Sequence, residues 1–352
     1  MRTRRSISLR VLPALTVVGL FLGAVVPAIA QKPTTVKLAT LVPERSVWGV
    51  LLRDLTEEWK RVTDGRVVAR IYPGGVAGDD PDIVRKMRIG QLQAATLTVT
   101  GLGEIDDAFN VFSIPLFYDS YEEYFYVLDS LEPVLRERLE AKGFFLLHWG
   151  HGGWIYLFAT EPVNTIDDLK RLKLFVWAQS DRLVRWWKDN GFRPVPLALT
   201  DVLPAMQTGM IEAVPSTPLA ALSLQWYRQT PYMLDMGLAP LVGATIITKR
   251  GWSKISKEDQ ERILVASSRA AESFEVEIPA QDASAIAEMQ KRGLTVNAPT
   301  DPATQRGWTD AAESFAAHFS DAFMPPEIYA MARKARDEFR SRNAAPNPAP
   351  EN

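Results

Sequence analysis

Strand-like and helix-like patterns alternate along most of this chain, and this alternation constrains its fold more than any other feature. Residues 35–40 alternate as a half-buried strand does, and residues 47–62 carry apolar side chains at helical spacing. The succession continues with a strand at 66–72, a helix at 80–90 and a strand at 94–99. Such alternation favours parallel sheets covered by helices, with ligands bound outside the carboxyl ends of the strands. The sequence therefore predicts an α/β fold.

The second half of the chain repeats this alternation. Two helical stretches are expected around residues 121–142, and strands at 144–149, 154–159 and 172–177. A capping pair, Ser256 and Asp259, opens a long helical pattern that ends near Lys291. Asp80 is the expected N-cap of the helix that contains Pro81. We therefore expect two α/β domains that are joined by crossing strands.

The expected domain boundaries follow from these patterns. Domain I is predicted at residues 31–157 with about 243–285, and domain II at residues 158–242 with about 286–342. Residues 343–352 contain Pro346, Pro348 and Pro350 and are predicted to form a disordered tail.

The first 30 residues have the three parts of a secretory signal. Arginines at positions 2, 4, 5 and 10 precede an apolar run over residues 11–26, and Ala28-Ile29-Ala30 offers a small-residue cleavage site. The run is shorter than the ~20 residues that a membrane-spanning helix needs. We expect cleavage between Ala30 and Gln31 and a periplasmic location, while Thr3-Arg4-Arg5 leaves the twin-arginine export route open.

Composition and motifs argue against several functions. The chain has no cysteine, which excludes disulfides, thiolate nucleophiles and thiolate metal sites. Its formal net charge of −2 without a basic block argues against nucleic acid as a partner, and no second apolar run is long enough to span a membrane. His148 and His151 lack acidic neighbours for a metal, and doublets such as Asp79-Asp80 are explained by helix capping. We expect no enzyme activity, no cofactor and no metal.

Several motifs occur in an order that is typical of one known family. They are Ala39-Thr40-Leu41-Val42-Pro43, Tyr72-Pro73-Gly74-Gly75, Gly90-Gln91-Leu92-Gln93-Ala94, Ile166-Asp167-Asp168-Leu169-Lys170 and Met206-Gln207-Thr208-Gly209. From about Val36 to about Lys291 the chain resembles the DctP-type solute-binding proteins of tripartite ATP-independent periplasmic (TRAP) transporters. The resemblance implies the two-domain architecture of periplasmic binding proteins, with a central cleft and a long helix that spans both domains. It also implies capture of a small-molecule solute by domain closure and delivery to membrane permease subunits.

The chain departs from this family where relatives bind a carboxylate. By alignment with the family motifs, its two usual arginines fall at Phe175 and Ile155, and a family asparagine falls near Ser216. Arginine binds a carboxylate through two hydrogen bonds, and a desolvated carboxylate without a partner costs roughly 3–5 kcal/mol. The departure predicts a hydrophobic or amphipathic solute.

Six of the predicted solute-binding residues lie on the expected strands at 144–149, 154–159 and 172–177, and two follow another strand that is expected at 211–214. The eight residues are Phe175, Trp177, Trp154, Ile155, Tyr156, Trp149, Ser216 and Leu219. Phe175 and Trp177 are two residues apart in a strand and so share a face, whereas Trp149 and Tyr156 are equally well explained as core. Two other functions remain open. The chain could bind a conventional organic acid through a relocated cation, Arg182 or Arg193, or it could be a periplasmic scaffold that has lost its ligand.

Overall fold

One mixed sheet forms the framework of the molecule. The computed structural model describes residues 32–177, 181–299 and 301–343. Across these residues nine strands form one sheet in the order β2-β1-β3-β8-β4-β7-β5-β6, with β9 paired to β8. The strands are β1 (Thr34–Thr40), β2 (Val67–Tyr72), β3 (Ala94–Thr98), β4 (Phe144–Ala159), β5 (Lys173–Trp177), β6 (Arg193–Leu197), β7 (Ala213–Ser216), β8 (Tyr232–Thr248) and β9 (Thr295–Asn297). The predicted export signal, its cleavage site and the predicted tail from residue 344 lie outside the described residues.

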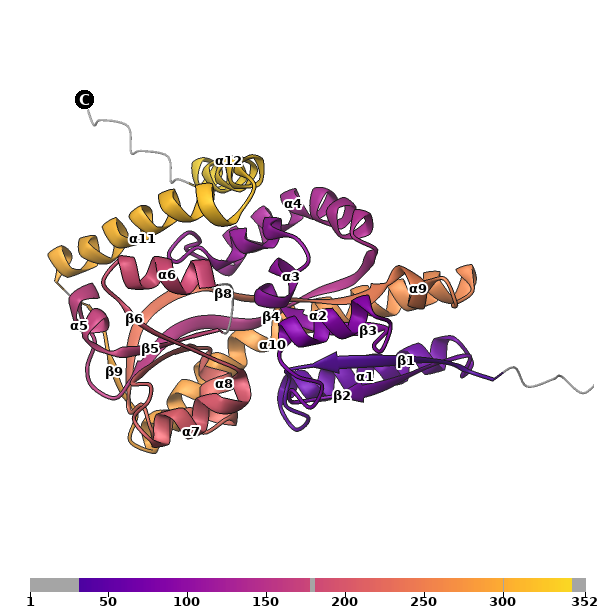
Figure 1. The fold of residues 1–352 in the computed structure, drawn as a ribbon, viewed down its shortest axis with the longest axis horizontal. Coiled ribbons are helices and arrows are strands. Elements are labelled where there is room, and N and C mark those ends of the chain that lie inside the picture. Colours follow the sequence, from indigo (N-terminus) through magenta and orange to yellow (C-terminus); the bar gives the residue numbers. More distant parts are fainter. Residues whose placement is uncertain (1–31, 178–180, 300, 344–352) are drawn as a thin grey trace, which may run out of the picture. The chain divides into compact units, whose positions relative to one another are not determined.

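Two groups of parallel strands flank the long central pair (Figure 1). The strands β2, β1 and β3 are parallel, as are β7, β5 and β6. Between them β8 and β4 pair antiparallel, β8 also bonding to β3 and β4 to β7. Strand β4 carries the chain from the first group to the second, and β8 brings it back. This arrangement confirms the predicted α/β class with crossing strands.

Helices connect and cover these strands. They are α1 (Val47–Val62), α2 (Asp80–Arg88), α3 (Val99–Gly103), α4 (Tyr121–Ala141), α5 (Ile166–Arg171), α6 (Asp181–Asp189), α7 (Val202–Gln207), α8 (Pro218–Ser223), α9 (Lys249–Trp252), α10 (Lys257–Lys291), α11 (Pro302–Phe323) and α12 (Pro326–Asn343), with 3₁₀ turns η1 (Asp107–Ser113), η2 (Leu199–Asp201) and η3 (Trp226–Arg228). Helices α1 and α2 form the crossovers between parallel strands that the alternating pattern predicts.

The long helix α10 links both groups of strands. It packs against α1, which follows the first strand, and against α8, which follows β7, as well as along β4. Ser256 caps it by accepting a hydrogen bond from the backbone N–H of Asp259 at 3.1 Å. The predicted capping box is only half formed, because the carboxylate of Asp259 binds the guanidinium of Arg66 at 2.7 and 3.0 Å instead of the N-cap backbone.

Some expected elements differ from those in the structure. Asp79 rather than Asp80 is the N-cap of α2, because Asp79 accepts from the next backbone N–H while the Asp80 carboxylate is buried against β3. The two strands expected at 144–149 and 154–159 are one strand, β4, whose register shifts absorb the intervening glycines. The two helical stretches expected around 121–142 are one helix that continues through Pro133. The residues from Pro33 on form one unit by their contacts, and the boundaries between two domains stay a prediction.

Candidate functional site

Two adjoining cavities lie where the two groups of strands meet. The inner cavity has a volume of about 190 Å³ and lies between β1, β3, α1, β4, β8 and the turn from β7 to α8. The aromatic cavity has a volume of about 210 Å³ and is walled mainly by Phe112, Phe175, Trp187, Phe315 and Phe319. The two share lining residues, among them Thr98, Ile155 and Trp177, so they form one cleft with two compartments.

The topology of the sheet places the inner cavity at the ends of strands. Thr40 ends β1, Thr98 ends β3, Trp177 ends β5 and Ser216 ends β7, and all four residues line this cavity. Each of these strands is parallel to its neighbours in its own group. The site is therefore where an α/β sheet is expected to bind a ligand, outside the carboxyl ends of its strands.

The lining of the cleft carries no formal charge. Among the described residues that line either cavity there is no aspartate, glutamate, lysine or arginine. His148 lines the inner cavity, and burial lowers the pKa of this imidazole to about 4, which leaves it neutral at physiological pH. Its Nδ1 donates to the backbone oxygen of Trp149 at 2.8 Å. The cleft thus suits a ligand with a large apolar surface.

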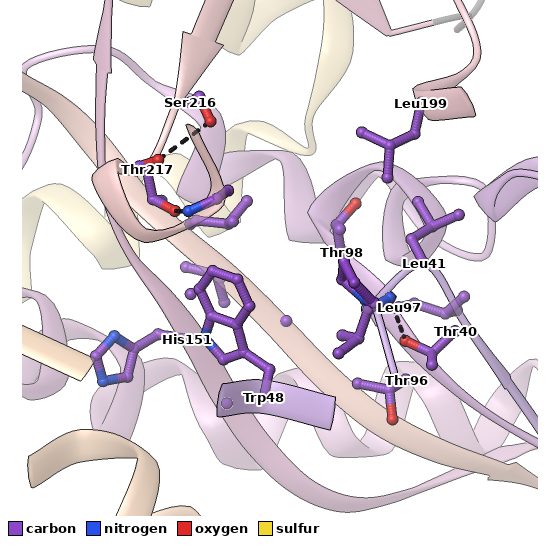
Figure 2. Close-up of a pocket in the computed structure, with 18 of the residues that line it drawn as sticks. Thr40, Leu41, Trp48, Thr96, Leu97, Thr98, His151, Leu199, Ser216 and Thr217 are labelled. Atoms are coloured by element: carbon purple, nitrogen blue, oxygen red, sulfur yellow. Dashed lines mark hydrogen bonds between the residues drawn. The ribbon is translucent and has the colours of Figure 1, made fainter. Parts of the chain in front are cut away.

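Five threonines line the inner cavity, four of which are labelled in Figure 2. Thr96 and Thr245 share a hydrogen bond of 2.8 Å between their hydroxyls, and Thr98 donates to a carboxylate oxygen of Asp80 at 2.6 Å. Thr40 and Thr217 differ, because each hydroxyl accepts from a backbone N–H, at 3.1 and 3.3 Å respectively. A hydroxyl that accepts in this way retains a proton that it can donate to a ligand.

A buried carboxyl group, that of Asp80, holds Thr98 in place through hydrogen bonds. Asp80 is fully buried, and its Oδ2 accepts from both the backbone N–H and the hydroxyl of Thr98, at 3.0 and 2.6 Å. Burial raises the pKa of Asp80 to about 7, although the hydrogen bonds from Thr98 act in the opposite direction. Asp80 therefore acts as a positioning residue for a threonine that lines both cavities.

The structure places four of the eight predicted solute-binding residues in the cleft walls. Ile155 and Trp177 line both cavities, Ser216 lines the inner cavity and Phe175 lines the aromatic one. Phe175 and Trp177 contact each other edge to face, with ring centroids 5.4 Å apart. Ile155 and Phe175, where the family resemblance predicts that two arginines are replaced, are thus brought to one cleft.

The other four predicted residues are not among those that line either cavity. Trp149 packs against Phe109 and Phe112 and donates from Nε1 to Glu132 at 3.1 Å, so it belongs to the core. Trp154 packs edge to face on Tyr121, and Tyr156 is half-buried on the same strand. Leu219 packs beside Trp48 and Ile278. Alternation along β4 explains this, because Ile155 faces the cleft while its neighbours point to the opposite side. Contact of these four with solute stays a prediction.

Of the two proposed replacement cations, the structure describes the side chain of Arg193, which lies away from the cleft. Arg193 is exposed at the start of β6 and donates to the backbone oxygen of Arg171 at 2.6 Å, at the end of the strand away from the cleft. Arg182 lies in the first turn of α6, and its side chain lies outside the part of the chain that the structure describes.

Sequence reasoning missed two contributors to the cleft. Trp48 was not singled out within the helix predicted at residues 47–62, yet it lines the inner cavity. Strand β8 supplies residues 241–245 of the wall, and no strand was predicted there. The apolar run of residues 238–247 was the available signal for this strand.

The fold and the cleft together define a class of protein. A sheet of two parallel groups, joined by crossing strands and a long shared helix around an interior cleft, is the build of a periplasmic binding protein. Residues 38–321 match bacterial extracellular solute-binding protein family 7 (DctP), and the chain belongs to this family. The family consists of solute-binding receptors rather than enzymes, and the protein is a TRAP-type periplasmic solute receptor.

Individual relatives agree with this assignment. A solute-binding protein of Chromohalobacter salexigens is 28% identical over 225 residues, which cover 63% of this chain and 67% of the relative. The crystal structure of a TRAP periplasmic solute-binding protein from the same species, with bound D-glucuronate, has a TM-score of 0.78 at 23% identity and covers 86% of this chain and 99% of that one. DctP7, a Bordetella pertussis solute receptor that binds pyroglutamic acid, has a TM-score of 0.79 at 19% identity, with 86% and 99% covered. These structural likenesses support the shared fold.

No helix in the described ranges combines the length and the apolar composition that crossing a bilayer requires.

Proposed function

We propose that this receptor captures an organic acid whose body is apolar or aromatic. The observation that carries the proposal is the lining of the cleft, in which the described residues present rings, aliphatic side chains, hydroxyls and imidazoles but no aspartate, glutamate, lysine or arginine. A sugar acid with many hydroxyls would leave most of them without partners on such walls, at a cost of roughly 1–3 kcal/mol for each group.

The structural relatives support the acidic part of this proposal. The Chromohalobacter protein holds D-glucuronate and the Bordetella protein binds pyroglutamic acid, and both ligands are carboxylates. These ligands favour an organic acid over a purely apolar solute. Of the hydrophobic or amphipathic solutes that the sequence predicts, we therefore propose an amphipathic acid. Pyroglutamic acid also shows that the fold accepts a compact acid with few hydroxyls.

The two compartments of the cleft give the proposal a geometry. The aromatic cavity would hold the body of the solute against Phe175, Trp187 and Phe315, and the inner cavity, with its hydroxyls, would hold the acidic end. Full burial of an apolar group as large as a leucine or phenylalanine side chain contributes on the order of 1.5–3 kcal/mol to the free energy of binding. Closure of the two predicted domains over the solute, delivery to TRAP permease subunits and export with cleavage between Ala30 and Gln31 are parts of the same proposal.

The identity of the natural solute tests the proposal directly. The exported protein would be purified from its own periplasm and denatured in organic solvent, and the released compounds would be identified by mass spectrometry against a mock purification. We expect a stoichiometric amphipathic acid. A stoichiometric sugar acid would refute the apolar body, and a stoichiometric apolar compound without an acidic group would refute the acid.

A substitution at Phe175 tests whether the aromatic cavity holds the apolar body of the solute while the inner cavity holds its acidic end. This side chain is 2% exposed and stands where relatives have an arginine. Phe175→Arg should weaken the binding of phenylacetate by tenfold or more, because a desolvated guanidinium replaces a ring in the aromatic cavity, and should strengthen the binding of D-galacturonate. Phe175→Leu is the matched control and should change phenylacetate binding by less than about fivefold. A Phe175→Arg protein that binds phenylacetate more tightly than the unaltered protein would overturn the apolar compartment.

A conventional carboxylate receptor with a relocated cation is the second candidate. One observation favours it: Arg182 immediately precedes Leu183, which lines the aromatic cavity. Arg182→Met should then abolish acid binding, whereas Arg185→Met, on the exposed side of α6, should not. Equal binding by both variants would rule this candidate out.

A further inference from the structure

We infer that Trp48 donates a hydrogen bond from its indole N–H to an oxygen of the solute, and so selects solutes that carry an oxygen acceptor at this place. This inference rests on the proposed function, since it concerns the same cleft. It assigns to a neutral donor the task that arginine performs in relatives.

The indole nitrogen of Trp48 is a buried donor in the cleft for which the described residues offer no acceptor. The side chain is 8% exposed and lines the inner cavity, yet its Nε1 is buried without a hydrogen-bond acceptor among the described residues. Buried polar groups are almost always paired, and one left unpaired costs roughly 1–3 kcal/mol. Indole N–H is a donor only, so the partner that it lacks must be an acceptor such as a carboxylate or carbonyl oxygen.

The other tryptophan in the same helix shows the usual behaviour. Trp59 is 1% exposed, and its Nε1 donates to the hydroxyl of Ser267 on α10 at 3.1 Å. Both indoles belong to α1, but only Trp48 reaches the cavity. Trp48 therefore lacks the acceptor that the other tryptophan of its helix has.

The ring of Trp48 is held from three elements. It packs with Leu219 of α8 and Ile278 of α10, and its own backbone lies in the first turn of α1. In the view of Figure 2 it lies between His151 and the threonines of β1 and β3. A donor fixed in this way loses little conformational entropy when it binds, which favours specificity. Thr40 and Thr217, whose hydroxyl protons are available in the same cavity, complete a set of neutral donors.

Neutral donors select ligands differently from a guanidinium. An arginine favours a carboxylate through charge, whereas an indole N–H and hydroxyls bind any exposed oxygen acceptor. The cavity should therefore bind phenylacetamide within about tenfold of phenylacetate, and should reject phenethylamine, which offers no acceptor in its charged form.

The test compares Trp48→Phe with Trp59→Phe by isothermal titration with phenylacetate and phenylacetamide. Trp48→Phe should weaken both probes by about tenfold or more, as expected for one lost hydrogen bond to a buried acceptor. Trp59→Phe should leave both affinities unchanged. In the protein without ligand, Trp48→Phe should lower the melting temperature less than Trp59→Phe, because it removes a donor that has no partner.

NMR of the indole N–H groups distinguishes a hydrogen bond to the ligand from a role of Trp48 in packing alone, because packing alone would not shift the indole proton resonance when the ligand binds. In protein labelled with ¹⁵N-tryptophan, the resonance that disappears in Trp48→Phe should shift downfield in its proton dimension when phenylacetate binds. Binding of the probes with unchanged affinity in Trp48→Phe, or without a shift of this resonance, would overturn the role of Trp48 and leave the proposed function intact. Failure of phenylacetate to bind the unaltered protein would overturn the proposed solute class itself.

Discussion

A single methyl group at position 153 should disrupt the joint between the long helix and the crossing strands. Gly153 lies in β4 with φ of +105°, a conformation that L side chains rarely adopt, and a Cβ built there would come within 2.1 Å of Oδ2 of Asp282 on α10. That oxygen accepts from the backbone N–H of Trp154 at 3.1 Å, while Oδ1 accepts from the backbone N–H of Leu219 at 3.2 Å. One buried carboxyl group thus joins α10, β4 and α8.

The cost of Gly153→Ala has two parts. The left-handed conformation costs an alanine roughly 1–2 kcal/mol. Displacement of the carboxyl group leaves at least one buried N–H unpaired, at roughly 1–3 kcal/mol. Together they predict a loss of about 2–5 kcal/mol in the free energy of unfolding.

Urea denaturation followed by circular dichroism measures this loss. Gly150→Ala is the matched control, because Gly150 lies in the same strand and a Cβ there meets no atom within 4 Å. It should change the free energy of unfolding by less than about 1 kcal/mol. If Gly153→Ala were as stable as Gly150→Ala, the proposed interlock between Asp282 and the strand would be wrong.

Two further predictions concern buried acids and their partners. Burial raises the pKa of Asp282 to about 7, so the folded protein holds this proton more tightly than the unfolded chain does. The stability that the group contributes should therefore fall as pH rises from about 4 to 7 and stay level above that. The free energy of unfolding of the unaltered protein minus that of Asp282→Asn should decrease over this range by as much as about 4 kcal/mol, and a difference that does not vary with pH would contradict the raised pKa. Arg66→Ala should lower the free energy of unfolding, because it leaves the carboxylate of Asp259, whose side chain is 4% exposed, without the guanidinium that binds both of its oxygens. Arg85→Ala, which breaks an exposed pair with Asp82, should lower the free energy of unfolding less, and equal losses in thermal melts would refute the distinction.

Much of the fold could be predicted because its signals are local. The strand and helix patterns around β1, α1 and β2 depend on periodicity within a few residues, and the structure confirms them. The long helix α10 was predicted because Ser256 caps it and its helical pattern runs to Lys291. The strand β8 escaped prediction because its C-terminal part is buried on both faces, so its apolar run lacks the alternation of a half-buried strand.

The candidate site was only partly predictable. Phe175 and Ile155 were found because the chain departs from a family motif at these positions, and both line the cleft. Trp149 and Trp154 were chosen for their residue type, and the structure places them away from both cavities because neighbouring strand residues alternate between two faces. Trp48 was missed because a buried indole on the apolar face of a helix looks the same in sequence whether or not its N–H has a partner.

The sequence by itself determined the α/β class and the membership of a solute-receptor family, since each depends on local pattern or on residue identity. Only the tertiary structure decided which side chains share the cleft, that the described lining carries no charge, and that one indole donor there lacks an acceptor. These properties depend on residues far apart in the sequence, such as Trp48 and Ile278, which are 230 positions apart, and the packing of α1 and α8 against α10 brings them together.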